Sequence, residues 1–142
     1  MRMVLFGGLK MEQIKIGTKS EKNLAKLLRN FGFWVYNMPL KVNGQPCDIV
    51  AAKENIIFLI DSKHTAKKPS FTFERVEPNQ QSAMDYAVNF AHIKNVGFAI
   101  YFERDENWYW LPYTQYLETQ KKSVNISELI RLEDVINENI NK

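Results

Sequence analysis

Cysteine and histidine are scarce in this sequence. Among its 142 residues there is one cysteine, Cys47, and there are two histidines, His64 and His92. A single cysteine cannot form a disulfide within the chain, which is typical of proteins of the reducing cytoplasm. The three side chains are also too few for a metal centre built from cysteine and histidine. We therefore expect a cytoplasmic protein in which any metal is bound by oxygen ligands.

Long apolar stretches are absent as well. No run approaches the roughly 18 apolar residues of a membrane span, and residues 3–9 are too short and too broken by glycine for a signal peptide. With 45% hydrophobic and 25% charged residues, the chain has the composition of a soluble globular protein. Its length predicts one domain, placed at residues 17–142 after a tail of residues 1–16. The net charge of +3 permits a nucleic-acid partner without requiring one.

Two apolar runs that each carry an acid form the centre of the pattern. Asp48 lies in residues 46–50, and Asp61 directly follows the apolar residues 56–60. Polar residues 53–55 supply a turn, so the runs can pair as a hairpin that brings Asp48 beside Asp61. Adjacent carboxylates repel each other, and Mg²⁺ or Mn²⁺ is the simplest partner that relieves the repulsion. Lys63 shares the face of Asp61; a surface ion pair is the alternative interpretation.

The first expected helix carries a third acid. Thr18 and Glu21 have the spacing of a capping box, apolar residues follow on one helical face, and Gly32 ends the helix. Glu21 either caps this helix or faces a metal site on neighbouring strands.

A second helix is predicted to begin at Pro78, a tolerated first-turn position. Its buried face comprises positions 84, 87, 88 and 91, and Gln80 lies on the same stripe. A buried amide needs hydrogen-bond partners. Gln80 therefore either caps the helix or bonds a loop, or it points at the acid pair.

The remaining pattern predicts an α/β domain with a mixed sheet. Residues 33–38, 96–102 and 108–111 are expected strands, the last of them rich in aromatics that either pack or stack on bases. Residues 71–73 are an expected edge strand, residues 113–119 a short helix, and residues 127–140 a C-terminal helix that covers the sheet or a partner subunit. Helices thus alternate with strands along the chain.

The ordered set of these motifs resembles the PD-(D/E)xK nucleases, and within them the RecU-type Holliday junction resolvases, including phage versions. The resemblance spans roughly residues 17–116 and rests on Glu21, Asp48, Asp61-Ser62-Lys63 and Gln80. Two features depart from it: Cys47 separates Pro46 from the first acid, and the connection before Asp48 is shorter than the RecU insertion. The resemblance implies a restriction-endonuclease-like core, a mixed sheet flanked by helices.

The same resemblance implies Mg²⁺-dependent hydrolysis of DNA at four-way junctions by a homodimer, with Mn²⁺ as a substitute. Asp48, Asp61, the Ser62 carbonyl and Glu21 would bind metal, Lys63 would orient the attacking water, and Gln80 would position the site. The expected DNA contacts are Lys19, Lys41, His64, Lys67, Lys68 and Arg75. Two alternatives remain open: a restriction- or repair-type nuclease that cuts duplex or flap DNA, and a non-catalytic DNA-binding module with the same fold.

Overall fold

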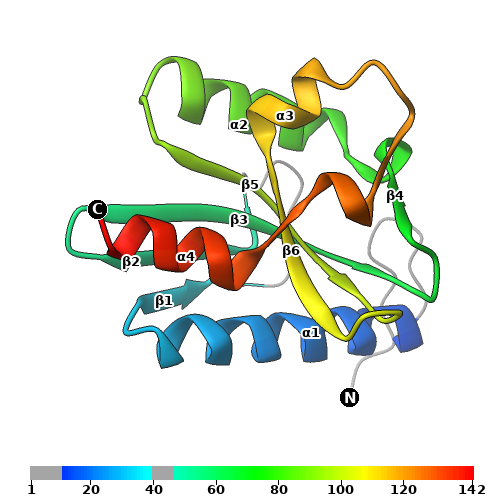
Figure 1. The fold of residues 1–142 in the computed structure, drawn as a ribbon, viewed down its shortest axis with the longest axis horizontal. Coiled ribbons are helices and arrows are strands. Elements are labelled where there is room, and N and C mark those ends of the chain that lie inside the picture. Colours follow the sequence, from blue (N-terminus) through cyan, green and yellow to red (C-terminus); the bar gives the residue numbers. More distant parts are fainter. Residues whose placement is uncertain (1–10, 40–46) are drawn as a thin grey trace.

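A six-stranded mixed sheet forms the centre of the molecule (Figure 1). The computed structural model describes residues 11–39 and 47–142, with side chains from residue 20 onward. Neighbouring strands are antiparallel except for the central pair β3 and β5, which is parallel. In spatial order the strands are β1 (Trp34–Asn37), β2 (Ile49–Lys53), β3 (Ile56–Thr65), β5 (Asn95–Phe102), β6 (Asn107–Pro112) and β8 (Ile130–Arg131).

Helices cover both faces of this sheet. On one face, α1 (Met11–Asn30) and α4 (Leu132–Ile140) enclose a core that includes Phe58 and Trp110. On the other, α2 (Pro78–Asn89) and α3 (Tyr113–Glu118) enclose a second core around Phe98 and Leu111. Figure 1 shows α1 and α2 on opposite sides of the sheet. A parallel pair needs a crossover connection, and α2 lies in the one that joins β3 to β5.

A small second sheet extends that crossover. It pairs β4 (Ser70–Thr72) with β7 (Ser123–Asn125), and the short 3₁₀ helices η1 (Phe73–Arg75) and η2 (Ile126–Glu128) follow the two strands. Phe71 of β4 is fully buried beneath it, packed with Val124 in the second core. The strand expected at residues 71–73 is therefore found one residue earlier, at residues 70–72. Its partner β7 lies far away in the sequence.

The α/β class and the mixed sheet are confirmed, as is the hairpin that carries the acids. Lys53 pairs with Ile56 across a two-residue turn, and Glu54 in that turn has a positive φ of 54°. The aromatic residues of β6 are buried, and Trp110 packs edge-on against Phe58 at 5.4 Å between ring centroids. Packing rather than base stacking is thus their role.

Several element boundaries differ from expectation. Helix α1 begins at Met11, so Thr18 lies within it and the predicted capping box is wrong; residues 11–16, expected in a tail, are helical. The C-terminal helix begins at Leu132 because residues 126–131 form η2 and β8 instead, which also makes β8 the last strand. Helix α2 ends at Asn89, leaving Ala91 exposed beyond it. The turn signal Asn43-Gly44 lies outside the described residues.

No helix in the described part of the chain is both long and apolar enough to span a membrane.

Candidate active site

Asp48 and Asp61 lie side by side on adjacent strands. The pairing of Ile49 with Ile60 in the β2–β3 hairpin places the two acids opposite each other just beyond it. The backbone N–H of Asp48 donates to the carbonyl of Ile60 at 2.9 Å, and the N–H of Ser62 donates to Asp48 Oδ2 at 2.8 Å. Asp48 is 7% exposed and Asp61 is 1% exposed. The predicted juxtaposition of the two carboxylates is confirmed.

Asp61 is held by a lysine and an amide. Gln80 Nε2 donates to Asp61 Oδ1 at 2.6 Å, and Lys63 Nζ lies 3.0 Å from Asp61 Oδ2 as an ion pair. Although that ion pair neutralises charge, no donor among the described residues is directed at Oδ2 with hydrogen-bond geometry. Native structures seldom leave a buried oxygen so incompletely satisfied. Asp61 Oδ2 is therefore the atom of the site with capacity for a further partner.

Gln80 combines two roles that the sequence left as alternatives. Its side chain is 3% exposed in the first turn of α2, where Gln80 Oε1 accepts from the N–H of Glu77 at 3.3 Å in a reciprocal capping box. The same amide reaches Asp61 through its nitrogen. Capping the helix fixes the amide orientation, so the helix start and the acid pair are positioned together.

Lys63 is surrounded by acceptors. Besides Asp61, its ammonium donates to the main-chain carbonyl of Arg75 at 3.1 Å and to Gln80 Oε1 at 3.4 Å. The ammonium thus makes two hydrogen bonds and one ion pair. The arrangement fixes the cation beside the acids, on the face of the sheet that the alternation of side chains predicts.

Two nearby groups have shifted pKa values. Burial raises the pKa of the Cys47 thiol to about 11, and the negative charges of Asp48 and Asp61 add to the increase. Cys47 is therefore a neutral thiol at physiological pH. Burial lowers the pKa of the Arg75 guanidinium, and the charge of Asp61 partly opposes that change. In both groups burial is the larger cause, and the charges of the acids are the smaller one.

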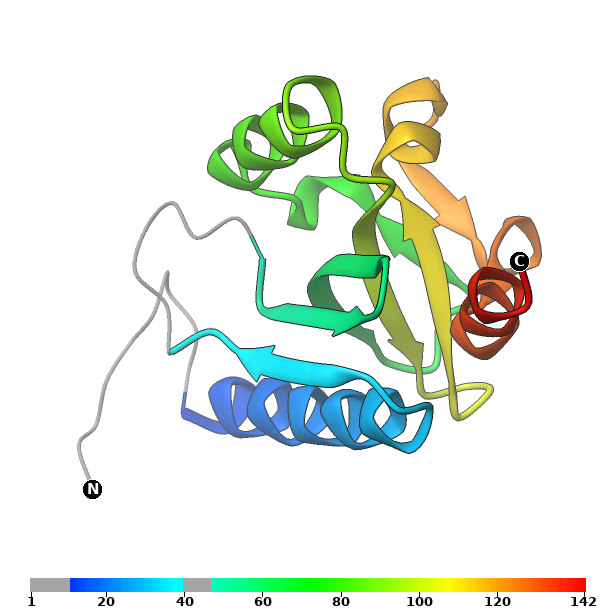
Figure 2. The same ribbon diagram turned by 90° about the vertical axis from the view of Figure 1, so that its left-hand side faces the viewer.

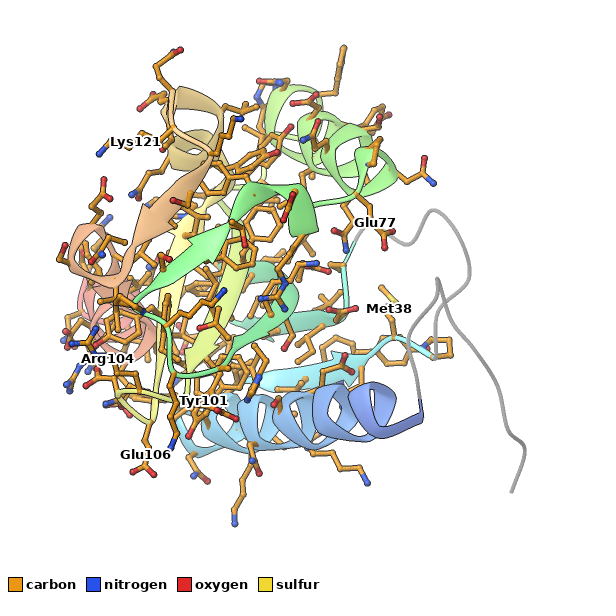
Figure 3. All side chains as sticks on the ribbon, turned by 90° about the vertical axis from the view of Figure 1, so that its right-hand side faces the viewer. Met38, Glu77, Tyr101, Arg104, Glu106 and Lys121 are labelled. Carbon is orange, nitrogen blue, oxygen red and sulfur yellow. The ribbon has the colours of Figure 1, made fainter. Side chains whose placement is uncertain are left out.

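Two residues that flank the site are labelled in Figure 3. It shows Glu77 at the start of α2 and Met38 just after β1 on the same side of the molecule. The Met38 N–H donates to the carbonyl of Asp48 at 2.8 Å, and Glu77 caps the turn that holds Gln80. A cavity of about 450 Å³ near Pro69, Arg104 and Asn125 contains none of the site residues. This cavity is therefore separate from the two buried acids.

Glu21 is half-buried in α1, beyond the helix start where a cap would act. Among the described residues, no three side chains of His, Cys, Asp or Glu are close enough to hold one metal ion. A contribution of Glu21 to metal binding, directly or through water, stays a prediction.

The expected DNA contacts occupy different environments. Lys67 and Lys68 are exposed between β3 and β4. The guanidinium of Arg75 lies 5.3 Å from the centroid of the Phe71 ring. His64 Nε2 is 3.3 Å from a carboxylate oxygen of Glu103, and its ring stacks on Tyr101. The side chain of Lys19 and all of Lys41 lie outside the described residues.

Two groups that help to position the site residues were not predicted from the sequence. Glu77 forms the capping box with Gln80, and its E-x-x-Q spacing around Pro78 was a signal that could have found it. The carbonyl of Arg75 accepts from Lys63, and no side-chain pattern can reveal a main-chain acceptor.

Comparison with known proteins adds family information. Residues 12–142 match the family model described as archaeal Holliday junction resolvase (Hjc), a range that includes every described site residue. A search of curated protein sequences gives no match. The match confirms the resemblance to Holliday junction resolvases of the PD-(D/E)xK superfamily, with the archaeal Hjc family in place of the RecU type.

Two solved structures are similar in fold. Hjc from Archaeoglobus fulgidus, a Holliday junction resolvase from an archaeal hyperthermophile, superposes with a TM-score of 0.64 at 22% identity, covering 85% of this chain and 95% of that one. The bacterial homing endonuclease I-Ssp6803I gives a TM-score of 0.48 at 15% identity, covering 76% and 70%. The first of these comparisons confirms the restriction-endonuclease-like fold expected from the motifs.

Proposed function

The chain belongs to the archaeal Holliday junction resolvase (Hjc) family, and from this we propose that it is a Mg²⁺-dependent endonuclease that cuts four-way DNA junctions. The observation that carries the proposal is the buried pair of Asp48 and Asp61 with Lys63 fixed beside it. Hydrolysis of a phosphodiester requires stabilisation of negative charge and an oriented water, and this group of residues is suited to both.

The donor set fits a divalent cation. Asp61 Oδ2 is buried and receives no hydrogen bond, while Asp48 offers a second carboxylate beside it. Oxygen ligands of this kind suit Mg²⁺, and Mn²⁺ can substitute. We assign the ion to Asp48, Asp61 and the Ser62 carbonyl, with Glu21 acting through water. When bound, the ion supplies Lewis acidity that stabilises charge on the phosphate.

The protein side chains supply the remaining parts of the reaction. Lys63, held by two hydrogen bonds and the ion pair with Asp61, presents a positive charge next to the scissile phosphate and orients the attacking water. Gln80 keeps Asp61 in one orientation through the 2.6 Å hydrogen bond. Beyond the site, the proposed contacts to the DNA backbone are Lys19, Lys41, His64, Lys67, Lys68 and Arg75.

We also propose that the protein is a homodimer that acts in the cytoplasm. A four-way junction must be cut in two strands, and a two-fold dimer presents two equivalent centres to it.

The direct test uses a four-way junction and a linear duplex of the same arm sequence, each strand labelled in turn. We expect paired, symmetric nicks in the junction alone when Mg²⁺ is present, and no nicks once EDTA removes the ion. Equal cutting of the linear duplex would instead assign the same chemistry to a restriction- or repair-type nuclease. Junction binding without cutting in either Mg²⁺ or Mn²⁺ would leave a non-catalytic DNA-binding module.

Replacing Gln80 should weaken the reaction through the position of Asp61. Removal of a residue that orients a metal ligand commonly costs about 10- to 100-fold in activity or metal affinity. We therefore expect Gln80→Ala to reduce the cleavage rate by that factor and to raise the Mg²⁺ concentration needed for half-maximal rate. Asn79→Ala, an exposed neighbour in the same helical turn, is the matched control. A variant with an unchanged Mg²⁺ requirement would contradict the positioning role.

A further inference from the structure

Arg75 is the last residue of η1, and its main chain is fixed beside the acid pair. Its carbonyl accepts the 3.1 Å hydrogen bond from Lys63 Nζ. Main-chain bonds hold both ends of η1: the N–H of Phe73 donates to the carbonyl of Lys122 at 2.9 Å, and the N–H of Val76 donates to the carbonyl of Phe73 at 3.0 Å. The backbone of Arg75 therefore has a fixed position relative to Lys63.

The guanidinium of Arg75 rests on a pair of rings next to Asp61. Its central carbon lies 5.3 Å from the centroid of the Phe71 ring, and the ring centroids of Phe71 and Phe98 are 6.4 Å apart. Phe98 is the partner of Asp61 in the β3–β5 register. Both side chains lie on the sheet face that α2 covers, which Figure 2 shows on the side away from α1. The charge of Asp61 also acts on the guanidinium, since it opposes the fall in the Arg75 pKa that burial causes.

None of the described side chains takes up the charge of Arg75. The ion pairs among them are made by Lys63, His64 and Arg131, and no described acceptor bonds the guanidinium of Arg75. A guanidinium carries five N–H donors in a planar arrangement that matches two phosphate oxygens. Arg75 is an exposed residue, so a ligand from solution can reach it. Its donors are therefore positioned for an anion with paired oxygens.

A phosphodiester bound beside the acid pair would use these donors in the reaction itself. In hydrolysis a water oxygen bonds to phosphorus, the bond from phosphorus to one ester oxygen breaks, and that ester oxygen receives the proton that the water loses. Negative charge grows on the non-bridging oxygens during the attack. A guanidinium that donates to these oxygens stabilises the transition state more strongly than the bound substrate.

We propose that Arg75 is a catalytic residue whose guanidinium donates to the non-bridging oxygens of the scissile phosphate. The inference rests on the proposed function and deepens it. Arg75 contacts the phosphate that is cut, whereas Lys67 and Lys68, exposed beyond the end of β3, contact phosphates that are not cut. One residue thus binds the reacting group through its side chain and holds Lys63 through its carbonyl.

The first measurement is the single-turnover cleavage rate at saturating protein and Mg²⁺, together with the dissociation constant of the junction. Arg75→Gln removes the charge but leaves the main-chain acceptor of Lys63 in place. We expect its rate to fall by about 100-fold, and Arg75→Lys, which keeps the charge, to recover part of the loss. Arg104→Gln, an exposed arginine at the cavity that contains no site residue, is the matched control and should cut at the wild-type rate. Thermal melts verify that each variant is folded.

The second measurement locates the phosphate that Arg75 contacts, by binding in EDTA without cleavage. Each junction of a series carries a single methylphosphonate linkage, in which a neutral methyl group replaces a charged non-bridging oxygen, at successive positions near the branch point. At the phosphate that Arg75 contacts, wild type should lose about 10-fold in affinity, and Arg75→Gln should show no such loss. We expect this position to coincide with the nick that wild type makes in Mg²⁺.

The outcomes separate a catalytic arginine from an ordinary backbone contact. An Arg75→Gln rate within about threefold of wild type at saturation, with only weaker binding, would overturn the inference. So would a methylphosphonate effect that Arg75→Gln abolishes away from the nick, or at no position. A raised Mg²⁺ requirement, as expected for Gln80→Ala, would also overturn it, because Arg75 would then act through the metal ligands.

Two further results keep the test decisive. If Arg75→Gln melts below the assay temperature, Arg75→Lys undergoes the same two measurements, and full wild-type behaviour in both would overturn the inference. A wild type that cuts no junction refutes the proposed function, whereas a wild type and an Arg75→Gln variant that cut equally well refute the inference alone.

Discussion

Asp61→Asn is expected to reduce junction cleavage by roughly 10³-fold or more, a loss of about 4 kcal/mol of transition-state stabilisation. The substitution keeps the shape of the side chain, so its oxygen can still accept from Gln80. It removes the negative charge that lies against Asp48 and that a divalent cation would need. The measurement is the single-turnover cleavage rate at saturating protein and Mg²⁺.

The same variant should bind junctions at least as well as wild type, because one negative charge near the DNA backbone is lost. Its thermal stability should stay close to that of wild type, because the lost repulsion between two buried carboxylates offsets the lost ion pair with Lys63. Asp134→Asn, an exposed acid in the first turn of α4, removes the same charge far from the site and should cut normally. If Asp61→Asn cut junctions within about tenfold of wild type, the assignment of Asp61 would be wrong.

Gly97→Ala should destabilise the protein by about 3 kcal/mol or more. A methyl group at Gly97 would lie 2.3 Å from the carbonyl oxygen of Leu111 and 3.0 Å from Cα of Pro112, its partner across β5 and β6. Both atoms belong to the main chain, so the end of β6 must move. Replacing glycine by alanine within a strand usually increases the free energy of unfolding by about 0.5–1 kcal/mol. At Gly97 we expect a decrease instead.

Thermal or urea unfolding measures this effect, and we expect a melting temperature lower by about 10 °C. Gly32→Ala is the comparison. Its φ of 91° makes alanine cost about 1–2 kcal/mol, but the nearest atom is the flexible end of Lys53, which can move away. If Gly97→Ala lowered the free energy of unfolding no more than Gly32→Ala does, the prediction would be wrong, because β6 would then shift without cost.

The sequence alone predicted that the two acids lie side by side, because the pattern that indicates it lies within a short stretch of the chain. Asp48 and Asp61 lie on strands joined by a two-residue turn, so the register follows from the turn and the alternation of side chains. Gln80 was found because its position on the buried stripe of α2 required a polar partner. Each of these conclusions needed fewer than 35 consecutive residues, numbers 48–80.

Other features depend on distant or weak signals. The T-x-x-E spacing at Thr18 resembles a helix start, but nothing in residues 11–17 prevents a helix, and α1 continues through them. Strand β4 pairs with β7, about 50 residues later in the chain, and local periodicity carries no information on such a partner. Strand β8 has two residues, too few to show the period of a strand.

The start of α2 has a consequence for which changes can silence the site. Gln80 accepts from the Glu77 N–H through Oε1 and donates to Asp61 Oδ1 through Nε2. Because one amide makes both bonds, fraying of the first turn of α2 would turn that amide away from Asp61. Glu77, an exposed residue outside the acid pair, therefore influences the chemistry through a helix cap.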